Sequence, residues 1–142
     1  MGGDCIKRPV RILELDGGGV RGVFQNKGME LIINQAGIPD TEIWKYFDII
    51  IGTSIGGITA LGYSVGKSPT YILDLLFDNA EEIFPGGPAS SGKILLDVTA
   101  SGYVYGNAPL SMLLQQTLGN TTMERLLNVN TFITTVAMTK PI

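Results

Sequence analysis

The sequence predicts an α/β domain, built as a three-layer α/β/α arrangement with a mostly parallel central sheet. Two observations carry this prediction. Short apolar runs alternate with longer segments of helical periodicity, an order that is typical of a parallel sheet. Two glycine-rich turns also stand between an apolar run and a helical segment, so each of them marks a strand–turn–helix unit.

The composition indicates one globular domain with a sizeable core. The chain has 142 residues, of which 44% are hydrophobic and 16% are charged, and this is not the balance of a disordered segment. The net charge of −3 does not favour nucleic-acid binding, which needs a clustered basic face. The single cysteine, Cys5, forms no disulfide within the chain, and no apolar run approaches the roughly 20 residues of a membrane span. We therefore expect a cytoplasmic protein without a transmembrane segment.

The first half of the chain predicts two strands and a long helix. Residues Val10–Leu15 alternate imperfectly and end at a glycine, which indicates a strand. Residues Val23–Gln35 carry apolar side chains at helical spacing, and Gly37 is a typical helix stop. After a short helix that ends near Phe47, residues Asp48–Ile51 form an apolar run of the kind that a parallel sheet buries on both faces.

Two further helices are expected after the second strand. The first runs from Ile55 to Val65 and ends at Gly66. The second begins at Ser68-Pro69, where proline suits the first helical turn, and continues to about Ile83.

The second half of the chain predicts a loop, two helices and a third strand. Residues 85–105 have the glycine- and serine-rich composition of a loop. Residues Pro109–Leu118 have helical periodicity, and Thr121–Glu124 fits a capping box before another short helix. Residues Thr131–Met138 are rich in β-branched side chains, which favours a strand.

The second glycine-rich turn matches the G-x-S-x-G pattern of a nucleophile elbow. The motif consists of Gly52, Thr53, Ser54, Ile55 and Gly56. Glycines suit this turn because side chains would clash where the strand meets the helix, and the turn lifts the serine hydroxyl to the helix N-terminus. The alternative interpretation of Ser54 is an ordinary helix-capping residue.

The first glycine-rich turn offers main-chain donors to a ligand oxygen. It reads Asp16-Gly17-Gly18-Gly19-Val20-Arg21-Gly22. Consecutive glycines let backbone amides approach a ligand closely, and the following helix N-terminus adds a partial positive charge. A raised serine beside such amides predicts a nucleophile with an oxyanion hole, and hence acyl transfer.

The same turn also satisfies the G-x-G-x-x-G fingerprint of a dinucleotide-binding domain. That interpretation needs an acidic residue about 20 positions later, at the end of a second strand. The candidates Asp40 and Glu42 lie in a turn with no strand before it. The fingerprint therefore stays a competing hypothesis whose acidic partner is misplaced.

A nucleophilic serine needs a base, and the chain contains no histidine. A Ser-His-Asp triad is therefore excluded, and an aspartate that contacts the hydroxyl directly is the remaining choice. Asp16 is better placed to hold the shape of its own loop, and Asp48 stands at the end of the sheet away from Ser54. Asp97, after the glycine- and serine-rich residues 86–92, stays open as a candidate base.

These motifs resemble the amino-terminal part of the patatin-like phospholipases. The resemblance rests on the two glycine-rich turns in the same order, and on the segments Phe47–Ile50 and Thr131–Ala137. It extends over nearly the whole chain from Val10 onward. It divides the chain into an N-terminal extension (1–9) and the amino-terminal portion of an acyl hydrolase domain (10–142).

The resemblance implies a serine lipid acyl hydrolase that uses a Ser-Asp dyad and no cofactor or metal. Ser54 would be the nucleophile of this phospholipase or non-specific esterase. Gly17, Gly18 and Gly19 would form the oxyanion hole. Asp16, Arg21 and Gly22 would support that loop. The implied substrate is a lipid or phospholipid, met at a membrane surface.

The aspartate of the dyad has no counterpart among these residues. In the family it lies in a separate Asp-Gly motif well after the third strand, whereas the only Asp-Gly here is Asp16-Gly17. We therefore expect the catalytic base to be absent from this chain and the fold to be incomplete at its C-terminal end. A catalytically inactive or truncated lipid-binding module is the alternative expectation.

Overall fold

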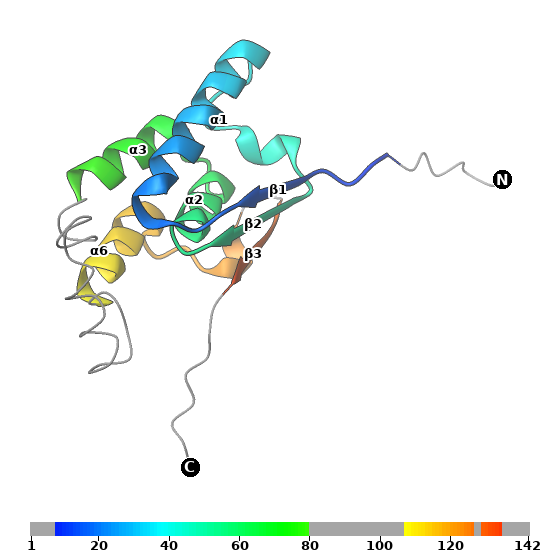
Figure 1. The fold of residues 1–142 in the computed structure, drawn as a ribbon. Helices are drawn as coiled ribbons and strands as arrows, with labels where there is room; N and C mark the ends of the chain where they lie inside the picture. Colours follow the sequence, from blue (N-terminus) through cyan, green and yellow to red (C-terminus); the bar gives the residue numbers. More distant parts are fainter. Residues whose placement is uncertain (1–7, 80–106, 127–128, 135–142) are drawn as a thin grey trace.

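The computed structural model describes residues 8–79, 107–126 and 129–134, which form a parallel sheet with helices beside it (Figure 1). The strands are β1 (Ile12–Leu15), β2 (Ile49–Thr53) and β3 (Asn130–Thr134), and they lie in the order β1-β2-β3. The central strand β2 pairs in parallel with both neighbours. The predicted α/β class with a parallel sheet is therefore confirmed.

Helix α1 (Gly22–Ala36) follows the first glycine-rich turn, as predicted. It ends at Gly37, whose φ of 65° is left-handed and whose amide bonds back to the Asn34 carbonyl. Glycine suits this position because it adopts left-handed backbone without a Cβ clash.

Helices α2 (Ile55–Ser64) and α3 (Pro69–Asp78) follow β2. The Ser68 side chain accepts a hydrogen bond from the Tyr71 amide at 3.0 Å, and proline stands in the first turn of α3. The predicted cap of α3 is therefore confirmed, while the predicted end at about Ile83 lies outside the described residues.

The remaining elements are shorter, apart from α6 (Asn107–Leu118). Three 3₁₀ turns complete the description: η1 (Gly19–Arg21), η2 (Ile43–Tyr46) and η4 (Met123–Arg125). The capping box expected at the last of them is wrong, because η4 begins one residue later and its capping Thr122 makes no side-chain bond. The predicted loop 85–105 and the end of the third strand at 135–138 lie outside the described residues.

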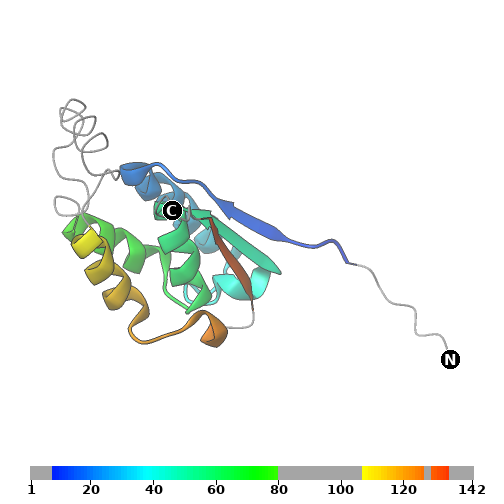
Figure 2. The ribbon, with the colours of Figure 1, turned by 90° about the horizontal axis from the view of Figure 1, so that it is seen from below.

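Helix α2 lies at the centre of the core (Figure 2). The sheet packs against one side of α2, and helices α1, α3 and α6 pack against the opposite side. Nine of its ten residues are buried. Two glycines permit this close packing: a Cβ on Gly57 would lie 3.1 Å from the Ile133 side chain in β3. A Cβ on Gly62 would lie 2.5 Å from the Ile72 side chain in α3. The small residues of α2 therefore let two layers approach it.

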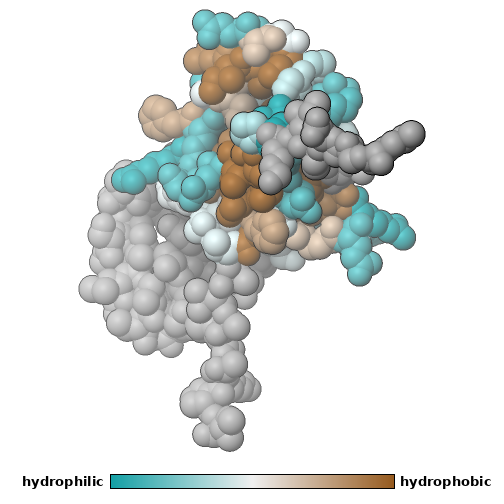
Figure 3. All heavy atoms as spheres, turned by 90° about the vertical axis from the view of Figure 1, so that its right-hand side faces the viewer, coloured by the Kyte–Doolittle hydropathy of each residue, from teal (hydrophilic) through white to brown (hydrophobic). Residues whose placement is uncertain are grey.

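The helices of the described ranges cover only one face of the sheet (Figures 1 and 2). Large apolar side chains remain exposed on its strands, with Ile12 at 53% and Phe132 at 57%. Hydrophobic residues also reach the surface on the side of the molecule that Figure 3 shows. The described residues thus form two of the three predicted layers. None of the helices in these ranges has the length and apolarity that crossing a bilayer requires.

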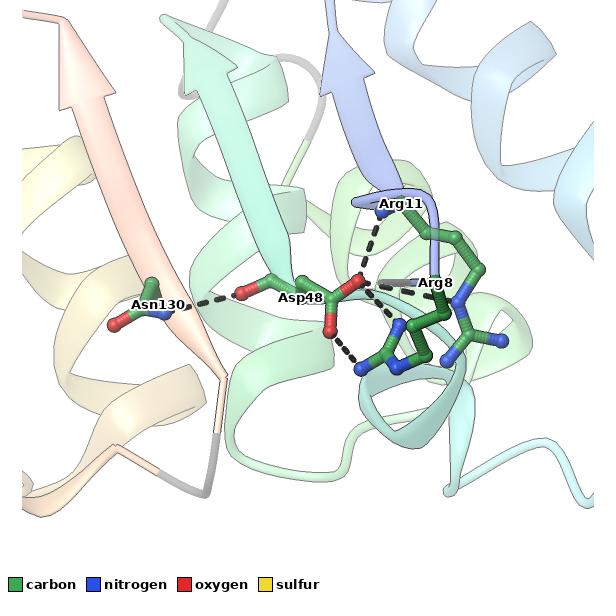
Figure 4. A network of polar contacts seen from close by, with 4 residues as sticks. All are labelled: Arg8, Arg11, Asp48 and Asn130. Carbon is green, nitrogen blue, oxygen red and sulfur yellow. Dashed lines mark hydrogen bonds and ion pairs between the residues drawn. The ribbon is translucent and has the colours of Figure 1, made fainter. Parts of the chain in front are cut away.

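A polar network joins the amino ends of the three strands (Figure 4). The Asp48 carboxylate accepts hydrogen bonds from the Arg8 guanidinium and, at 2.8 Å, from the Arg11 amide. The Asp48 carbonyl accepts from the Asn130 side chain at 3.2 Å. The Arg8 hydrogen bond and the Arg11 amide lower the pKa of Asp48 from an ordinary 3.8 to about 2.

We expect Asp48→Asn to be destabilising at neutral pH and nearly neutral in strong acid. The folded pKa of about 2 lies below the ordinary 3.8, so the carboxylate contributes stability above the unfolded pKa. This contribution disappears as the pH falls from about 4 towards 2. Urea denaturation of both proteins at pH 7, 5, 3 and 2 measures the difference, and Glu42→Gln in the exposed Glu42–Lys45 pair is the control. A deficit for Asp48→Asn that stays constant across this range would contradict the expectation.

Candidate active site

The two glycine-rich turns leave the sheet side by side at its carboxyl edge. Strands β1 and β2 are parallel neighbours, and Leu15 at the end of one pairs with Gly52 near the end of the other. Because parallel strands bring their carboxyl ends to one edge, the turns that follow them meet there. Ligand sites of α/β sheets are commonly at this edge.

The glycine loop and the elbow are in direct contact. A Cβ on Gly17 would lie 3.2 Å from the Ser54 Cβ and 3.2 Å from the Thr53 carbonyl. At the end of the loop, a Cβ on Gly22 would lie 2.8 Å from the Ile55 side chain. The structure therefore brings the two predicted motifs into contact at both ends of the glycine loop.

Ser54 has the backbone of a strained turn. Its φ of 55° and ψ of −123° make it the only non-glycine residue with positive φ among those described. A non-glycine residue in such a conformation costs about 1–3 kcal/mol and is typical of functional sites. The side chain is exposed and makes no capping hydrogen bond to α2. The interpretation of Ser54 as an ordinary capping residue is therefore wrong.

The elbow glycines are dictated by backbone packing. A Cβ on Gly56 would lie 2.1 Å from the Leu15 carbonyl oxygen and 2.6 Å from that of Asp16. A Cβ on Gly52 would lie 2.3 Å from the Gly56 carbonyl oxygen. These neighbours are main-chain atoms, which cannot rotate away as a side chain would. The strand, the loop and α2 therefore meet in this way only if both positions are glycine.

Two residues of the glycine loop have backbone conformations that favour glycine. Gly18 and Gly19 have φ values of 136° and 58°, which side chains disfavour. Within the described part of the chain, their amides have no hydrogen-bond acceptor. Both amides are therefore free of main-chain partners at the point where the loop begins α1.

Arg21 and Gln25 both contact this loop. The Arg21 amide donates to the Gly18 carbonyl at 3.2 Å, and the Arg21 stem packs against the Gly18 backbone. The Gln25 side-chain amide donates to the Asp16 carbonyl at 2.8 Å. The Asp16 carboxylate is exposed and makes no hydrogen bond to the described residues. Asp16 thus takes part in the loop through its main chain.

No acidic side chain among the described residues is hydrogen-bonded to the Ser54 hydroxyl. Asp48 lies at the opposite edge of the sheet, where two arginines hold it (Figure 4). The described ranges also contain no group of three acidic, cysteine or histidine side chains that would hold a metal. The expectation that the base comes from outside this chain stays a prediction.

The dinucleotide-binding hypothesis loses its structural support. Its acidic candidates, Asp40 and Glu42, lie before β2 rather than at the end of a strand. The end of β2 carries Ser54 instead. Among the described residues, no acidic side chain therefore follows β2, where the ribose of a dinucleotide would be held.

Three buried polar residues behind the site were not predicted. Asn26 in α1 and Thr59 and Tyr63 in α2 are almost fully buried and hydrogen-bonded to one another. Burial raises the pKa of the Tyr63 hydroxyl. The signal that could have revealed them in the sequence is a polar residue at a helix position whose spacing predicts an apolar, buried side chain.

Comparison with known proteins identifies relatives of this arrangement. The sequence model of the patatin-like phospholipase family matches residues 13–141. A cGAMP-activated phospholipase of Escherichia coli (strain TW11681) is 35% identical over 117 residues, which are 80% of this chain and 32% of that protein. A protein of the same description from Vibrio cholerae is 44% identical over 84 residues, or 56% of this chain and 24% of that protein.

A plant relative has a similar extent. Patatin-like protein 7 of Arabidopsis thaliana is 32% identical over 124 residues, which cover 80% of this chain and 25% of that protein. The chain thus spans about a third or less of the length of these relatives. Since the family match extends over most of the chain, the chain belongs to the patatin-like phospholipase family.

Proposed function

We propose that this chain supplies the nucleophile and the oxyanion hole of a serine lipid acyl hydrolase. The observation that carries the proposal is the contact between Gly17 and Ser54. In support of it, an exposed serine of strained backbone lies against a loop whose Gly18 and Gly19 amides have no acceptor among the described residues. Phospholipases among the relatives support a lipid as the substrate.

The mechanism follows from this geometry. The Ser54 hydroxyl attacks the acyl carbonyl carbon, and the carbonyl oxygen becomes an oxyanion. The amides of Gly18 and Gly19 stabilise that charge. Preorganised donors are effective here because they need no rearrangement when the charge develops. An aspartate outside residues 1–142 takes the serine proton and returns it to the leaving alcohol. Water then releases the fatty acid from the acyl-enzyme.

The substrate and its location are part of the same proposal. The attacked bond is a carboxylic ester of a lipid or phospholipid, and the enzyme is cytoplasmic and meets this ester at a membrane surface. The chemistry assigned to Ser54 and the loop amides needs no cofactor or metal.

Covalent labelling of Ser54 tests the proposal. We expect a fluorophosphonate probe to label the full-length protein, and peptide mass spectrometry to find the adduct on Ser54. Ser54→Ala should lose the label. Ser111→Ala, which removes an exposed serine of α6, should keep it.

Two results of the labelling experiment would contradict the proposal. A full-length protein that binds phospholipid vesicles without being labelled would contradict the hydrolase and support a non-catalytic lipid-binding module. Labelling that survives Ser54→Ala would contradict the assignment of the nucleophile.

A further inference from the structure

Helices α1 and α2 are joined by a buried polar network directly behind the candidate active site. Asn26 is fully buried, and its side-chain amide donates to the Gly22 carbonyl at 2.9 Å and to the Thr59 hydroxyl at 3.2 Å. The Thr59 hydroxyl donates to the Ile55 carbonyl at 3.1 Å. The network thus ends on two main-chain carbonyls, one in each helix.

The Gly22 carbonyl determines how the Asn26 amide is oriented, and the third member of the network then bonds to the Asn26 oxygen. The Tyr63 hydroxyl donates to the Asn26 side-chain oxygen at 2.8 Å. Reversing the amide would turn its oxygen toward the Gly22 carbonyl, which has no proton to donate. Each proton of this network therefore has one acceptor, so only one arrangement satisfies every group.

The two carbonyls belong to the first residues of the two helices. Gly22 ends the glycine loop and begins α1, while Ile55 follows Ser54 and begins α2. These residues also touch, since a Cβ on Gly22 would lie 2.8 Å from the Ile55 side chain. The network therefore holds the first turns of the two helices together at the point where the loop and the elbow meet.

The buried core also contains Met29, Ile33 and Ile58 in the same two helices. Replacing both partners of a buried hydrogen bond by apolar groups of the same shape can be nearly neutral in stability. A network with one satisfied arrangement instead selects one relative position of the helices. Catalysis is sensitive to such a position, because a 1 Å misplacement costs about 10²-fold in rate.

We propose that Asn26, Thr59 and Tyr63 are positioning residues, which hold the glycine loop at the distance from Ser54 that the reaction requires. This inference rests on the proposed function, because the distance matters for a carbonyl that both motifs grip. None of the three side chains reaches the substrate, since all are buried beneath the helix starts.

The test uses Thr59→Val and Tyr63→Phe in the full-length protein, with Ser64→Ala as the matched control. Ser64 is a buried hydroxyl of the same helix, but it bonds to the Ala60 carbonyl and to Thr131 in β3, away from the site. All three changes remove one buried hydroxyl. Urea denaturation first establishes which variants are folded and how much stability each has lost.

The kinetic readout separates positioning from folding. We expect Thr59→Val and Tyr63→Phe to lower the limiting rate of Ser54 phosphonylation about 10- to 100-fold, with little change in the half-saturating probe concentration. Ser64→Ala should leave the rate unchanged, and Thr59→Ser should restore it. Equal rate losses in Thr59→Val and Ser64→Ala would overturn the inference.

Hydrogen exchange tests the positioning without any activity. The amides of Arg21, Gly57 and Ile58, which are hydrogen-bonded to the Gly18 and Ser54 carbonyls, should exchange faster in Thr59→Val and Tyr63→Phe than in Ser64→Ala. If the native protein is never labelled but this difference appears, the proposed hydrolase fails and the positioning role falls with it, although the network still holds the loop against the elbow. If labelling is normal and neither the rate nor the exchange changes, the positioning role fails and the hydrolase stands.

Discussion

Gly56→Ala is expected to prevent the chain from folding as described. The added Cβ would lie 2.1 Å from the Leu15 carbonyl oxygen and 2.6 Å from the Asp16 carbonyl oxygen. Both are main-chain atoms at the end of β1, so relief requires the strand and α2 to separate. We expect a loss of about 3 kcal/mol or more in the free energy of unfolding, the upper end of overpacking effects. Urea denaturation, with the yield of folded protein, measures it.

Gly28→Ala is the matched control for this prediction. Gly28 lies within α1, and a Cβ there would meet nothing within 4 Å. Alanine should therefore raise the free energy of unfolding by about 1 kcal/mol, because it is the better helix former. A Gly56→Ala protein as stable as the native one would mean that α2 does not begin against the end of β1.

Replacing Ser54 should have opposite effects on activity and stability. Loss of the hydroxyl in Ser54→Gly removes the proposed nucleophile, so ester hydrolysis by the full-length protein should fall by about four orders of magnitude or more. Glycine also adopts the φ of 55° without the strain that serine carries. We therefore expect Ser54→Gly to raise the free energy of unfolding by about 1 kcal/mol. Ser54→Ala should lose the activity without this gain.

Ser68 provides the comparison, because it also stands at the N-cap of a helix. Its φ of −78° is ordinary, and its side chain accepts the Tyr71 amide at 3.0 Å. Ser68→Ala should therefore lower the free energy of unfolding by about 1 kcal/mol, whereas hydrolysis stays intact. Fatty-acid release and urea denaturation measure the two quantities. Equal destabilisation by Ser54→Gly and Ser68→Ala would contradict the strain at Ser54.

The exposed apolar residues of the sheet are consistent with the predicted third layer, which would cover them. Ile12 in β1 and Phe132 in β3 are more than half exposed, although the helices on the other face bury Ile50 completely. Strands of a parallel sheet are ordinarily covered on both faces. The sequence-based expectation of three layers therefore agrees with the strand composition, while the described residues contain two of them.

Local signals made most of the elements predictable. The end of α1 at Gly37 and the start of α3 at Ser68 each depend on one residue and its nearest neighbours. The same is true of the two strand–turn–helix units, whose glycines were recognisable from their spacing. The cap of η4 was the exception, since Thr122 rather than Thr121 begins that turn.

The sequence by itself therefore determined the strands, the helices, both glycine-rich turns and the family to which they belong, because neighbouring residues carry those signals. Only the tertiary structure decided that Gly17 lies against Ser54, that Tyr63 reaches Asn26, and that Asp48 pairs with arginines far from the site. Those contacts join residues that are 37 to 40 positions apart in the sequence. They depend on how closely β1, β2 and the two helices pack, and no local pattern of residues specifies that distance.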